Sequence, residues 1–352
     1  MNGINIGLIG AGSISELHLQ AYKKQPDVRL SAICDLNGDR AREKASRYGI
    51  PQVYTDYRDL LSDPEIEAVS ICTWNDTHAE IGIAALRAGK HVLVEKPLCR
   101  TVEEALQMQA AVRETGKILQ VGFVRRYDDK ARLIRRFIEK GEVGDIYYAK
   151  ASILRRLGNP GGWFADSSRS GGGPLIDIGV HMIDLCWYLM GRPKAVSVSG
   201  NTYNRLGNRS NVRGLSFYKA ADYDASLNTV EDMANAMIRF ENGASLMVDV
   251  SFTLHASKDE VTVKLYGDKG GIEAEPSLLI VSEKHDTILN IEPQIDHKTI
   301  QIEAAFQNEV KHFIECCRTG NTPISPVEDG LEIMKILCGI YESARLGQEI
   351  KL

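Results

Sequence analysis

The chain has 352 residues and a formal net charge of −5, with 43% hydrophobic and 25% charged residues. This composition is that of an ordinary globular protein, and it lacks the basic excess typical of a nucleic-acid-binding protein, so we expect no nucleic-acid partner. The length exceeds what one hydrophobic core usually supports, so we expect two domains.

The chain carries no sign of export or membrane insertion. Its first residues, "MNGINIGLIGAG", have neither the basic start nor the cleavage pattern of a secretory signal. No apolar run reaches the roughly 18 residues that span a bilayer, so we expect no membrane association. The seven cysteines are odd in number and form no CxxC pair, which indicates neither a disulfide framework nor a thiolate zinc site. We therefore expect a cytoplasmic location.

Short apolar runs alternate with helical patterns over the first third of the chain. The runs cover 4–9, 28–35, 68–72, 91–95 and 118–122, with helical spacing between them, as at 77–88 and 102–115. Runs this apolar have no face suited to water, which favours a parallel sheet covered by helices on both sides. We predict an α/β protein whose N-terminal domain, residues 1–122, is a doubly wound Rossmann sheet.

The turn after the first apolar run reads Gly10-Ala11-Gly12-Ser13-Ile14-Ser15. In a dinucleotide-binding turn the first glycine permits the tight turn, and the second lets the backbone approach a pyrophosphate at the helix N-terminus. Ser15 replaces the third glycine of that fingerprint. Asp35 ends the second run 20 positions later (35 − 15 = 20), which favours a dinucleotide site over a merely glycine-rich turn. We expect the cofactor to contact Gly10, Gly12, Ser13, Ile14 and Asp35.

Asp35 also bears on the choice of cofactor. A carboxylate here accepts hydrogen bonds from the ribose hydroxyls of NAD and repels the additional phosphate of NADP. Arg40 lies close enough in sequence to complicate this choice. We therefore expect NAD, with NADP less favoured.

After residue 122 the pattern changes to longer runs with period-two alternation. These runs cover 145–154, 194–203, 234–240, 244–252 and 260–267, and helical patterns follow at 303–318 and 327–346. Such alternation, with glycine turns, is typical of an open and largely antiparallel sheet. We predict a C-terminal α+β domain over 123–352. The most basic stretch, 124–136, is interrupted by two aspartates, and we expect it to form a mostly solvated helix face, with contact to an anionic ligand as the alternative.

The segment "GGGPLIDIGVHMIDLCWYLMG", residues 171–191, places two polar groups in an apolar helix. Asp177 and His181 are four residues apart, so both project from one helix face. A histidine near neutral pKa suits proton removal from a hydroxyl, and a carboxylate one turn away can orient its ring. Lys96, at the end of an apolar run, can supply positive charge for a developing alkoxide.

Other interpretations of these residues stay open. A histidine on an apolar helix can be a satisfied core residue, and Asp177, His181 and Asp184 could bind a metal, although no other His/Cys cluster supports this. We therefore expect no metal site. Trp163, in "NPGGWF", can stack on a sugar ring or simply pack against the core.

Two segments resemble the glucose-fructose oxidoreductase and inositol dehydrogenase (Gfo/Idh/MocA) family. They are "TWNDTHAEIGIAALRAGKHVLVEKPL" (73–98) and "GGGPLIDIGVHMIDL" (171–185), and the similarity extends along the whole chain. The resemblance implies an NAD-dependent oxidoreductase of CH–OH groups. It also implies that the C-terminal sheet carries the interface of a homodimer or homotetramer.

The resemblance further implies individual roles by position. Lys96 matches the lysine that reaches substrate and nicotinamide, and Asp177 and His181 match the catalytic pair. The cofactor side includes Thr73, Asn75, His78, Glu95 and Lys96, and the substrate side includes Lys96, Arg126, Tyr127, Trp163, Asp177 and His181. The chain departs from the family at Trp74, where proline is usual, and at 201–229, a polar stretch resembling a subfamily insertion that could shape substrate choice or a subunit contact.

The leading hypothesis is thus an NAD-dependent dehydrogenase of a polyol, sugar or sugar derivative. One alternative is a lyase, hydrolase or epimerase that reduces and reoxidises its NAD within one turnover. Another is a non-catalytic NAD-binding sensor, which the set of Lys96, Asp177 and His181 argues against.

Overall fold

The computed structural model describes residues 3–212, 214–215, 219, 224–297 and 299–352. The chain forms two compact units, the first comprising Met1–Tyr127 with Ile302–Met334 and the second Asp128–Gln301 with Lys335–Leu352. A segment from near the C-terminus therefore packs with the N-terminal unit. The predicted domains, an NAD-binding domain over 1–122 and a substrate-binding and oligomerisation domain over 123–352, stay a prediction.

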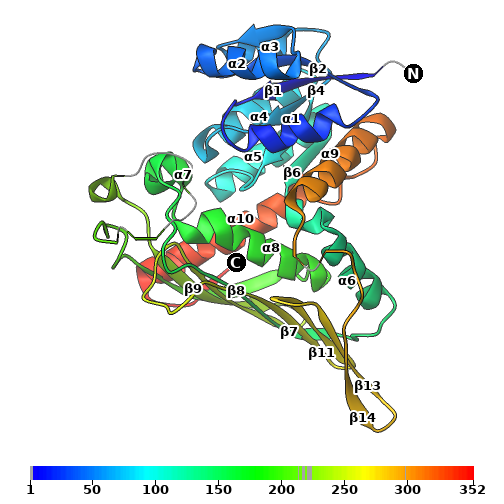
Figure 1. Cartoon of the computed structure of the whole chain (residues 1–352), viewed down its shortest axis with the longest axis vertical. Coiled ribbons are helices and arrows are strands. Elements are labelled where there is room, and N and C mark those ends of the chain that lie inside the picture. The colour runs from blue at the N-terminus through cyan, green and yellow to red at the C-terminus, as the bar shows by residue number, and fades with distance from the viewer. Residues whose placement is uncertain (1–2, 213, 216–218, 220–223, 298) are drawn as a thin grey trace. The chain divides into compact units, whose positions relative to one another are not determined.

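The first unit contains a six-stranded sheet in the order β3-β2-β1-β4-β5-β6. Figure 1 labels β1, β2, β4 and β6 of this sheet. Its strands are β1 (Ile4–Ile9), β2 (Val28–Cys34), β3 (Gln52–Tyr54), β4 (Ala68–Ile71), β5 (His91–Glu95) and β6 (Leu119–Gly122). All their pairings are parallel, which confirms the predicted Rossmann sheet. We did not predict β3, because its three residues are partly exposed and too few to show a pattern.

Helices cover both faces of this sheet. They are α1 (Ser15–Lys23), α2 (Gly38–Tyr48), α3 (Tyr57–Ser62), α4 (His78–Arg87), α5 (Val102–Thr115) and α9 (Ile302–Thr319), with short 3₁₀ turns η1 (Asn75–Thr77) and η2 (Val124–Tyr127). Local signals fix several helix ends: Thr101 and Glu104 form a capping box before α5, and Gly116 ends it in the left-handed conformation. Side chains of α9, including Phe306 and Phe313, join the core between the sheet and α1.

The second unit contains a nine-stranded sheet in the order β14-β13-β12-β11-β7-β10-β9-β8-β15. The strands are β7 (Ile146–Leu154), β8 (Ala195–Tyr203), β9 (Met233–Phe240), β10 (Ser245–Ser251), β11 (Glu260–Gly267), β12 (Gly270–Glu275), β13 (Leu279–Lys284), β14 (Thr287–Ile291) and β15 (Ile350–Lys351). Strands β7 and β10 pair in parallel, and the other pairings in the described chain are antiparallel. The predicted, mostly antiparallel sheet is confirmed. It also contains β12 to β15, which the sequence analysis did not predict.

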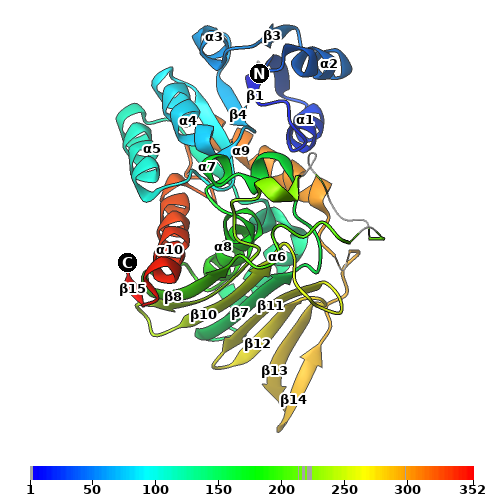
Figure 2. The same cartoon turned by 90° about the vertical axis from the view of Figure 1, so that its left-hand side faces the viewer.

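Helices lie over one face of the second sheet. The helical elements of this unit are α6 (Asp129–Glu139), α7 (Ser167–Ser170), α8 (Val180–Leu189), the turns η3 (Gly162–Ala165), η4 (Leu175–Gly179) and η5 (Ala225–Leu227), and the C-terminal part of α10 (Val327–Leu346). Figures 1 and 2 show α6 and α8 over the same face. Alternate residues of β9 are buried and the intervening ones are more exposed, which explains the period-two pattern. Within the described ranges, no helix is long and apolar enough to cross a membrane.

The expectation of a mostly solvated helix face over 124–136 is wrong for its first half. Arg126 lies in η2 rather than on a helix surface and is 1% exposed. Lys130 is 7% exposed, and its ammonium is 2.5 Å from a carboxylate oxygen of Glu275 on β12. Long basic side chains can bury their stems and pair with an acid, and sequence spacing alone does not reveal such partners.

Candidate active site

The predicted cofactor residues of the first unit lie at one edge of its sheet. The glycine turn follows β1, Asp35 follows β2, the Thr73–His78 loop follows β4, and Lys96 follows β5. These four strands are neighbours and run in parallel, so their carboxyl ends meet at the same edge. In open α/β sheets, ligands bind at this edge, where the strand order reverses.

The glycine turn has the backbone geometry that a dinucleotide site needs. Gly10 has φ +94°, and a Cβ there would lie 2.5 Å from the carbonyl oxygen of Cys72, so only glycine fits. At Gly12, by contrast, a Cβ would meet no protein atom within 4 Å, which leaves space for a ligand against the backbone. The N-cap of α1 is Ile14, which offers no side-chain cap to the first amides. The turn therefore fits a pyrophosphate, with the different roles expected for the two glycines.

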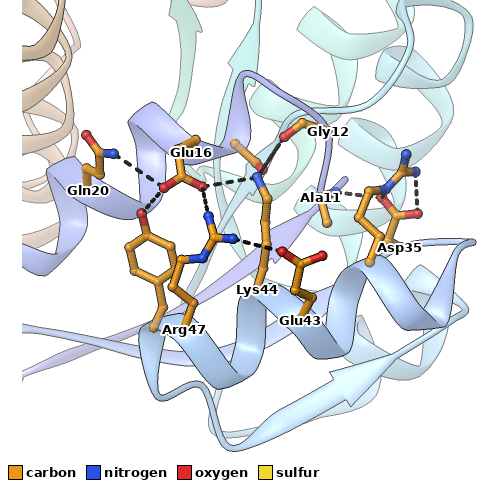
Figure 3. Close-up of polar contacts among 11 residues, drawn as sticks. Ala11, Gly12, Glu16, Gln20, Asp35, Glu43, Lys44 and Arg47 are labelled. Atoms are coloured by element: carbon orange, nitrogen blue, oxygen red, sulfur yellow. Dashed lines mark hydrogen bonds and ion pairs between the residues drawn. The ribbon is translucent and has the colours of Figure 1, made fainter. Parts of the chain in front are cut away.

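Ser15, at the position of the missing third glycine, holds the turn together with Lys44, whose ammonium Figure 3 shows beside Gly12. The Ser15 Oγ donates to the carbonyl oxygen of Gly12 at 2.6 Å, and the Lys44 Nζ donates to Ser15 Oγ at 2.6 Å and to Gly12 O at 2.8 Å. Lys44 also lies 3.5 Å from Glu16. Sequence analysis missed Lys44. The available signal was its place beside Ala45 on the buried face of α2, where a lysine is unusual.

Asp35 lies against the glycine turn and is already engaged by the chain itself. Its carboxylate accepts hydrogen bonds from the backbone amides of Ala11 and Asn37, both at 2.7 Å. The Arg40 guanidinium donates to it twice, at 2.7 and 3.2 Å, and its side chain is 48% exposed. Arg40 is therefore part of the Asp35 environment, as its sequence position suggested.

His78 fastens the loop after β4 to the segment after β5. It is fully buried, with Nδ1 2.8 Å from the carbonyl oxygen of Pro97 and Nε2 3.3 Å from that of Thr73. Burial lowers the pKa of His78, so the ring is neutral near pH 7 and donates to one carbonyl at a time. The Thr73 hydroxyl accepts from that of Thr77 at 2.8 Å, and Asn75 is buried.

Glu95 connects α1 to the strand end that carries Lys96. One carboxylate oxygen lies 2.8 Å from Nε2 of His18, and the other accepts from the backbone amide of Lys96 at 3.2 Å. Burial alone lowers the pKa of His18, but the neighbouring Cys72 and Glu95 raise it well above its ordinary value. Sequence analysis missed His18, which lies on the buried face of α1, three residues after Ser15 and four before Tyr22. Direct cofactor contacts of Glu95 and Lys96 stay predictions.

In the second unit, Asp177 and His181 share the one open strip of an otherwise buried segment. Between residues 172 and 187, all the remaining residues are buried, whereas these two are half-buried. The shared face is as expected, but the helix begins differently, because η4 is a π-helical turn and α8 starts only at Val180. Asp184 is 1% exposed. Within the described residues, no group of three or more His, Cys, Asp or Glu could hold a metal.

Arg126 and Tyr127 bind the segment that leads into α10 within the first unit. An Arg126 Nη donates to the carbonyl oxygen of Ile324 at 2.7 Å and lies 2.5 Å from the carboxylate of Asp329. The Tyr127 hydroxyl is 3.1 Å from that of Ser325. Both side chains are buried, and their contact with substrate stays a prediction.

Trp163 and the polar segment lie in loops of the second unit. Trp163 is half-buried in η3 and stacks on Phe164, with ring centroids 4.0 Å apart. Of the proposed insertion, 201–229, the first residues complete β8. Residues 213, 216–218 and 220–223 lie outside the described residues, so the prediction for the whole segment stays open.

Comparison with known proteins covers both units. Residues 4–123 match the family described as "Oxidoreductase family, NAD-binding Rossmann fold", and residues 135–352 match "Oxidoreductase family, C-terminal alpha/beta domain". D-glucoside 3-dehydrogenase of Escherichia coli (strain K12) is 31% identical over 99% of this chain and 97% of its own length. Levoglucosan dehydrogenase of Pseudarthrobacter phenanthrenivorans is 33% identical over 77% of this chain and 73% of its own length.

A solved structure agrees along the whole chain. Levoglucosan dehydrogenase in complex with NADH and L-sorbose has a TM-score of 0.86 and 27% identity, and the match covers 100% of this chain and 99% of that one. The two matched regions together span nearly all residues and carry the glycine turn, Lys96, Asp177 and His181. The chain therefore belongs to the Gfo/Idh/MocA family of oxidoreductases, with an NAD-binding Rossmann domain followed by a C-terminal α/β domain.

Proposed function

We propose that this protein is a dehydrogenase that oxidises a hydroxyl group of a sugar, polyol or sugar derivative with NAD. The observation that carries the proposal is that only Asp177 and His181, four positions apart, are half-buried between residues 172 and 187, where all the other residues are buried. A purely structural Asp–His pair does not need to be accessible, whereas a catalytic base must be accessible to its substrate. Relatives named for glucoside, levoglucosan and myo-inositol oxidation support the substrate class.

Three side chains divide the proton chemistry. His181, in its neutral form, takes the proton of the substrate hydroxyl, and the carboxylate of Asp177 stabilises the imidazolium that results. Lys96 keeps the developing alkoxide in place by its positive charge. When bound, NAD would supply the hydride acceptor for the same carbon, so the CH–OH group would lose one hydride and one proton and become a carbonyl.

The choice of NAD over NADP rests on Asp35. Its carboxylate is buried against the glycine turn, at the carboxyl end of β2, where an adenosine ribose is held in dinucleotide-binding sheets. Asp35 also accepts two hydrogen bonds from Arg40, whose side chain is half-exposed. A ribose therefore competes with Arg40 for Asp35, and an additional phosphate would meet the buried carboxylate.

The uncovered face of the second sheet supports assembly with further copies, as a homodimer or homotetramer. Within the described chain, no helix covers this face. Met237 and Met247 are cross-strand partners on it, and Tyr148 and Tyr266 stack with centroids 5.6 Å apart. Light scattering on the purified chain tests this proposal, and a monomer at micromolar concentration would contradict it. We also propose a cytoplasmic location, on the cysteine pattern alone.

The function is tested with a panel of sugars and polyols that includes levoglucosan, myo-inositol and methyl α-glucoside. NADH accumulation with one of them supports the dehydrogenase. Product without net NADH indicates instead a lyase, hydrolase or epimerase. Tight NAD binding with no product indicates a sensor.

The same assay then tests the named residues. His181→Ala should lower turnover by on the order of 10²–10⁴ with unchanged NAD affinity, and Asp177→Asn should lower it while the melting temperature moves little. His285→Ala, at the exposed turn between β13 and β14, removes a histidine as a control and should retain activity. Wild-type turnover in His181→Ala would remove His181 as the base.

A further inference from the structure

We infer that Glu231, together with Tyr341, is a positioning residue that sets the start of the helix carrying Asp177 and His181. The inference rests on the proposed function for what that helix does, but its structural part stands on its own contacts. Glu231 immediately precedes Asp232 and β9, and Tyr341 lies on α10. Both belong to the second unit, as does the helix that they hold.

The Glu231 carboxylate gathers three donors from two distant segments. One oxygen accepts from the backbone amide of Gly173 at 2.8 Å. The other accepts from the amide of Leu175 at 3.1 Å and from the Tyr341 hydroxyl at 2.9 Å. Glu231 is 9% exposed, so these bonds form in a largely dry environment, where they are stronger than in water.

The glycine triplet is what allows the segment to approach this carboxylate. A Cβ at Gly172 would lie 2.0 Å from the Tyr341 hydroxyl oxygen, and one at Gly173 would lie 2.3 Å from the backbone carbonyl oxygen of Glu231. Gly171 has φ +82°, in the left-handed region. Gly172 and Gly173 therefore form the surface that contacts Tyr341 and Glu231, and a side chain at either position would push the segment away from them.

The contact extends directly to Asp177. Gly173 is held by Glu231 through its amide, and its carbonyl oxygen accepts the amide of Asp177 at 3.0 Å. Leu175, the second amide bound by Glu231, is the first residue of the π-helical turn. Because a π turn winds more widely than an α turn, the direction of Asp177 relative to His181 depends on how this turn is anchored.

The negative charge of Glu231 is suited to anchoring the start of this helical segment. A carboxylate at a helix N-terminus is stabilised by the helix dipole and satisfies amides that have no partner within the helix. Burial nevertheless raises the pKa of Glu231, so the charge is costly here. An uncharged glutamine would avoid that cost, but its amide nitrogen cannot accept, so it could not hold both Gly173 and Leu175.

The test compares Glu231→Gln and Tyr341→Phe with Ser343→Ala as the matched control. Ser343 lies on the same helix as Tyr341, and its buried hydroxyl donates to the Gln348 carbonyl and accepts from the Gly200 amide. Tyr341→Phe and Ser343→Ala each remove one hydroxyl group from α10, but only Tyr341→Phe removes a contact of Glu231. Tyr341→Phe also serves if Glu231→Gln does not fold.

Two measurements are made on the full-length protein. Hydrogen exchange of the 171–185 peptide should become faster in Tyr341→Phe and faster still in Glu231→Gln, but not in Ser343→Ala. With whichever of levoglucosan, myo-inositol or methyl α-glucoside yields NADH, kcat should fall about 10-fold or more in Glu231→Gln, because small displacements of catalytic groups are costly. The Kd for NAD should stay at the wild-type value, because no contact of Glu231 or Tyr341 described above involves the glycine turn.

The two proposals fail in different ways. Wild-type exchange in both variants overturns the inference, as does wild-type kcat in Glu231→Gln while His181→Ala is inactive. An equal loss of kcat in Ser343→Ala overturns it too, because the effect would then be general destabilisation. If His181→Ala itself retains turnover, the proposed function fails, and the exchange measurement still decides whether Glu231 holds the segment.

Discussion

Replacing Lys44 by methionine should weaken NAD binding through the glycine turn without stopping turnover at saturating NAD. Lys44 approaches the turn from α2, and its ammonium is bonded to the carbonyl oxygen of Gly12 (Figure 3). That carbonyl shares its peptide group with the amide of Ser13. A cation on the oxygen polarises the peptide and makes this amide a better donor for a phosphate. The methionine keeps most of the side-chain volume and removes the ammonium, with its charge and its hydrogen bonds to Gly12 and Ser15.

The expected magnitudes follow from the contacts. Two hydrogen bonds from a charged donor contribute about 1.5 kcal/mol each at the lower end of the usual range. Part of this is offset, because burial lowers the pKa of Lys44 and its ammonium is costly to desolvate. Ser15 still donates to Gly12 in the variant, so the carbonyl stays satisfied. We expect a loss of about 1–2 kcal/mol in unfolding free energy, or roughly 2–6 °C in melting temperature.

The effect on cofactor affinity is expected to be separate and measurable. We expect the Kd for NAD to rise about 10-fold, which corresponds to about 1.4 kcal/mol. Calorimetric titration of NAD, well below the melting temperature, measures it. Arg47→Met is the matched control, because Arg47 lies on the same helix and contacts the same Glu16 at 3.6 Å but does not bond to the turn. Its Kd should stay within about twofold of the wild type.

Two results would refute this reasoning. If Lys44→Met binds NAD with the wild-type Kd, polarisation of the Gly12 peptide contributes nothing. If Arg47→Met weakens binding equally, the effect is the net charge of α2 and not the contact with the turn.

Three further predictions concern other parts of the chain. Asp35→Ser should shift the ratio of catalytic efficiencies from NAD toward NADP, because it removes a buried negative charge and releases Arg40; an unchanged ratio would remove Asp35 from the cofactor site. Against the effect of burial, Cys72 and Glu95 raise the pKa of His18, so the contacts of its protonated ring stabilise the fold fully below about pH 6.5, and this stabilisation is lost as the pH rises through the folded pKa. The difference in urea-unfolding free energy between wild type and His18→Gln should therefore shrink from pH 6 to pH 9, and a constant difference would contradict the assignment. Deleting 204–228 should leave the NAD Kd largely intact while altering substrate use or assembly, and loss of NAD affinity in a folded variant would place the segment in the cofactor site.

The strand and helix pattern was accessible from the sequence because it depends on local periodicity. The β1 and β5 boundaries and both ends of α10 agree with the predicted runs, and the glycine turn lies where its spacing indicated. The same holds for the shared face of Asp177 and His181, since four positions are about one helical turn, although the π-helical start of the segment was not accessible from spacing. Short or exposed strands such as β3 and β14 gave no comparable signal, because neither has enough buried alternate positions.

By itself, the sequence determined the two kinds of sheet, the dinucleotide-type turn and the polar pair on the buried helix, because each is encoded within a few turns or strands. Only the tertiary structure decided what holds these parts in place. The reason is physical: Lys44 reaches Gly12 across 32 positions, His18 reaches Glu95 across 77, and Glu231 reaches Gly173 across 58. Partners so distant along the chain meet only when the strands and helices pack. Local spacing can therefore indicate that such a residue is buried, but not which group it contacts.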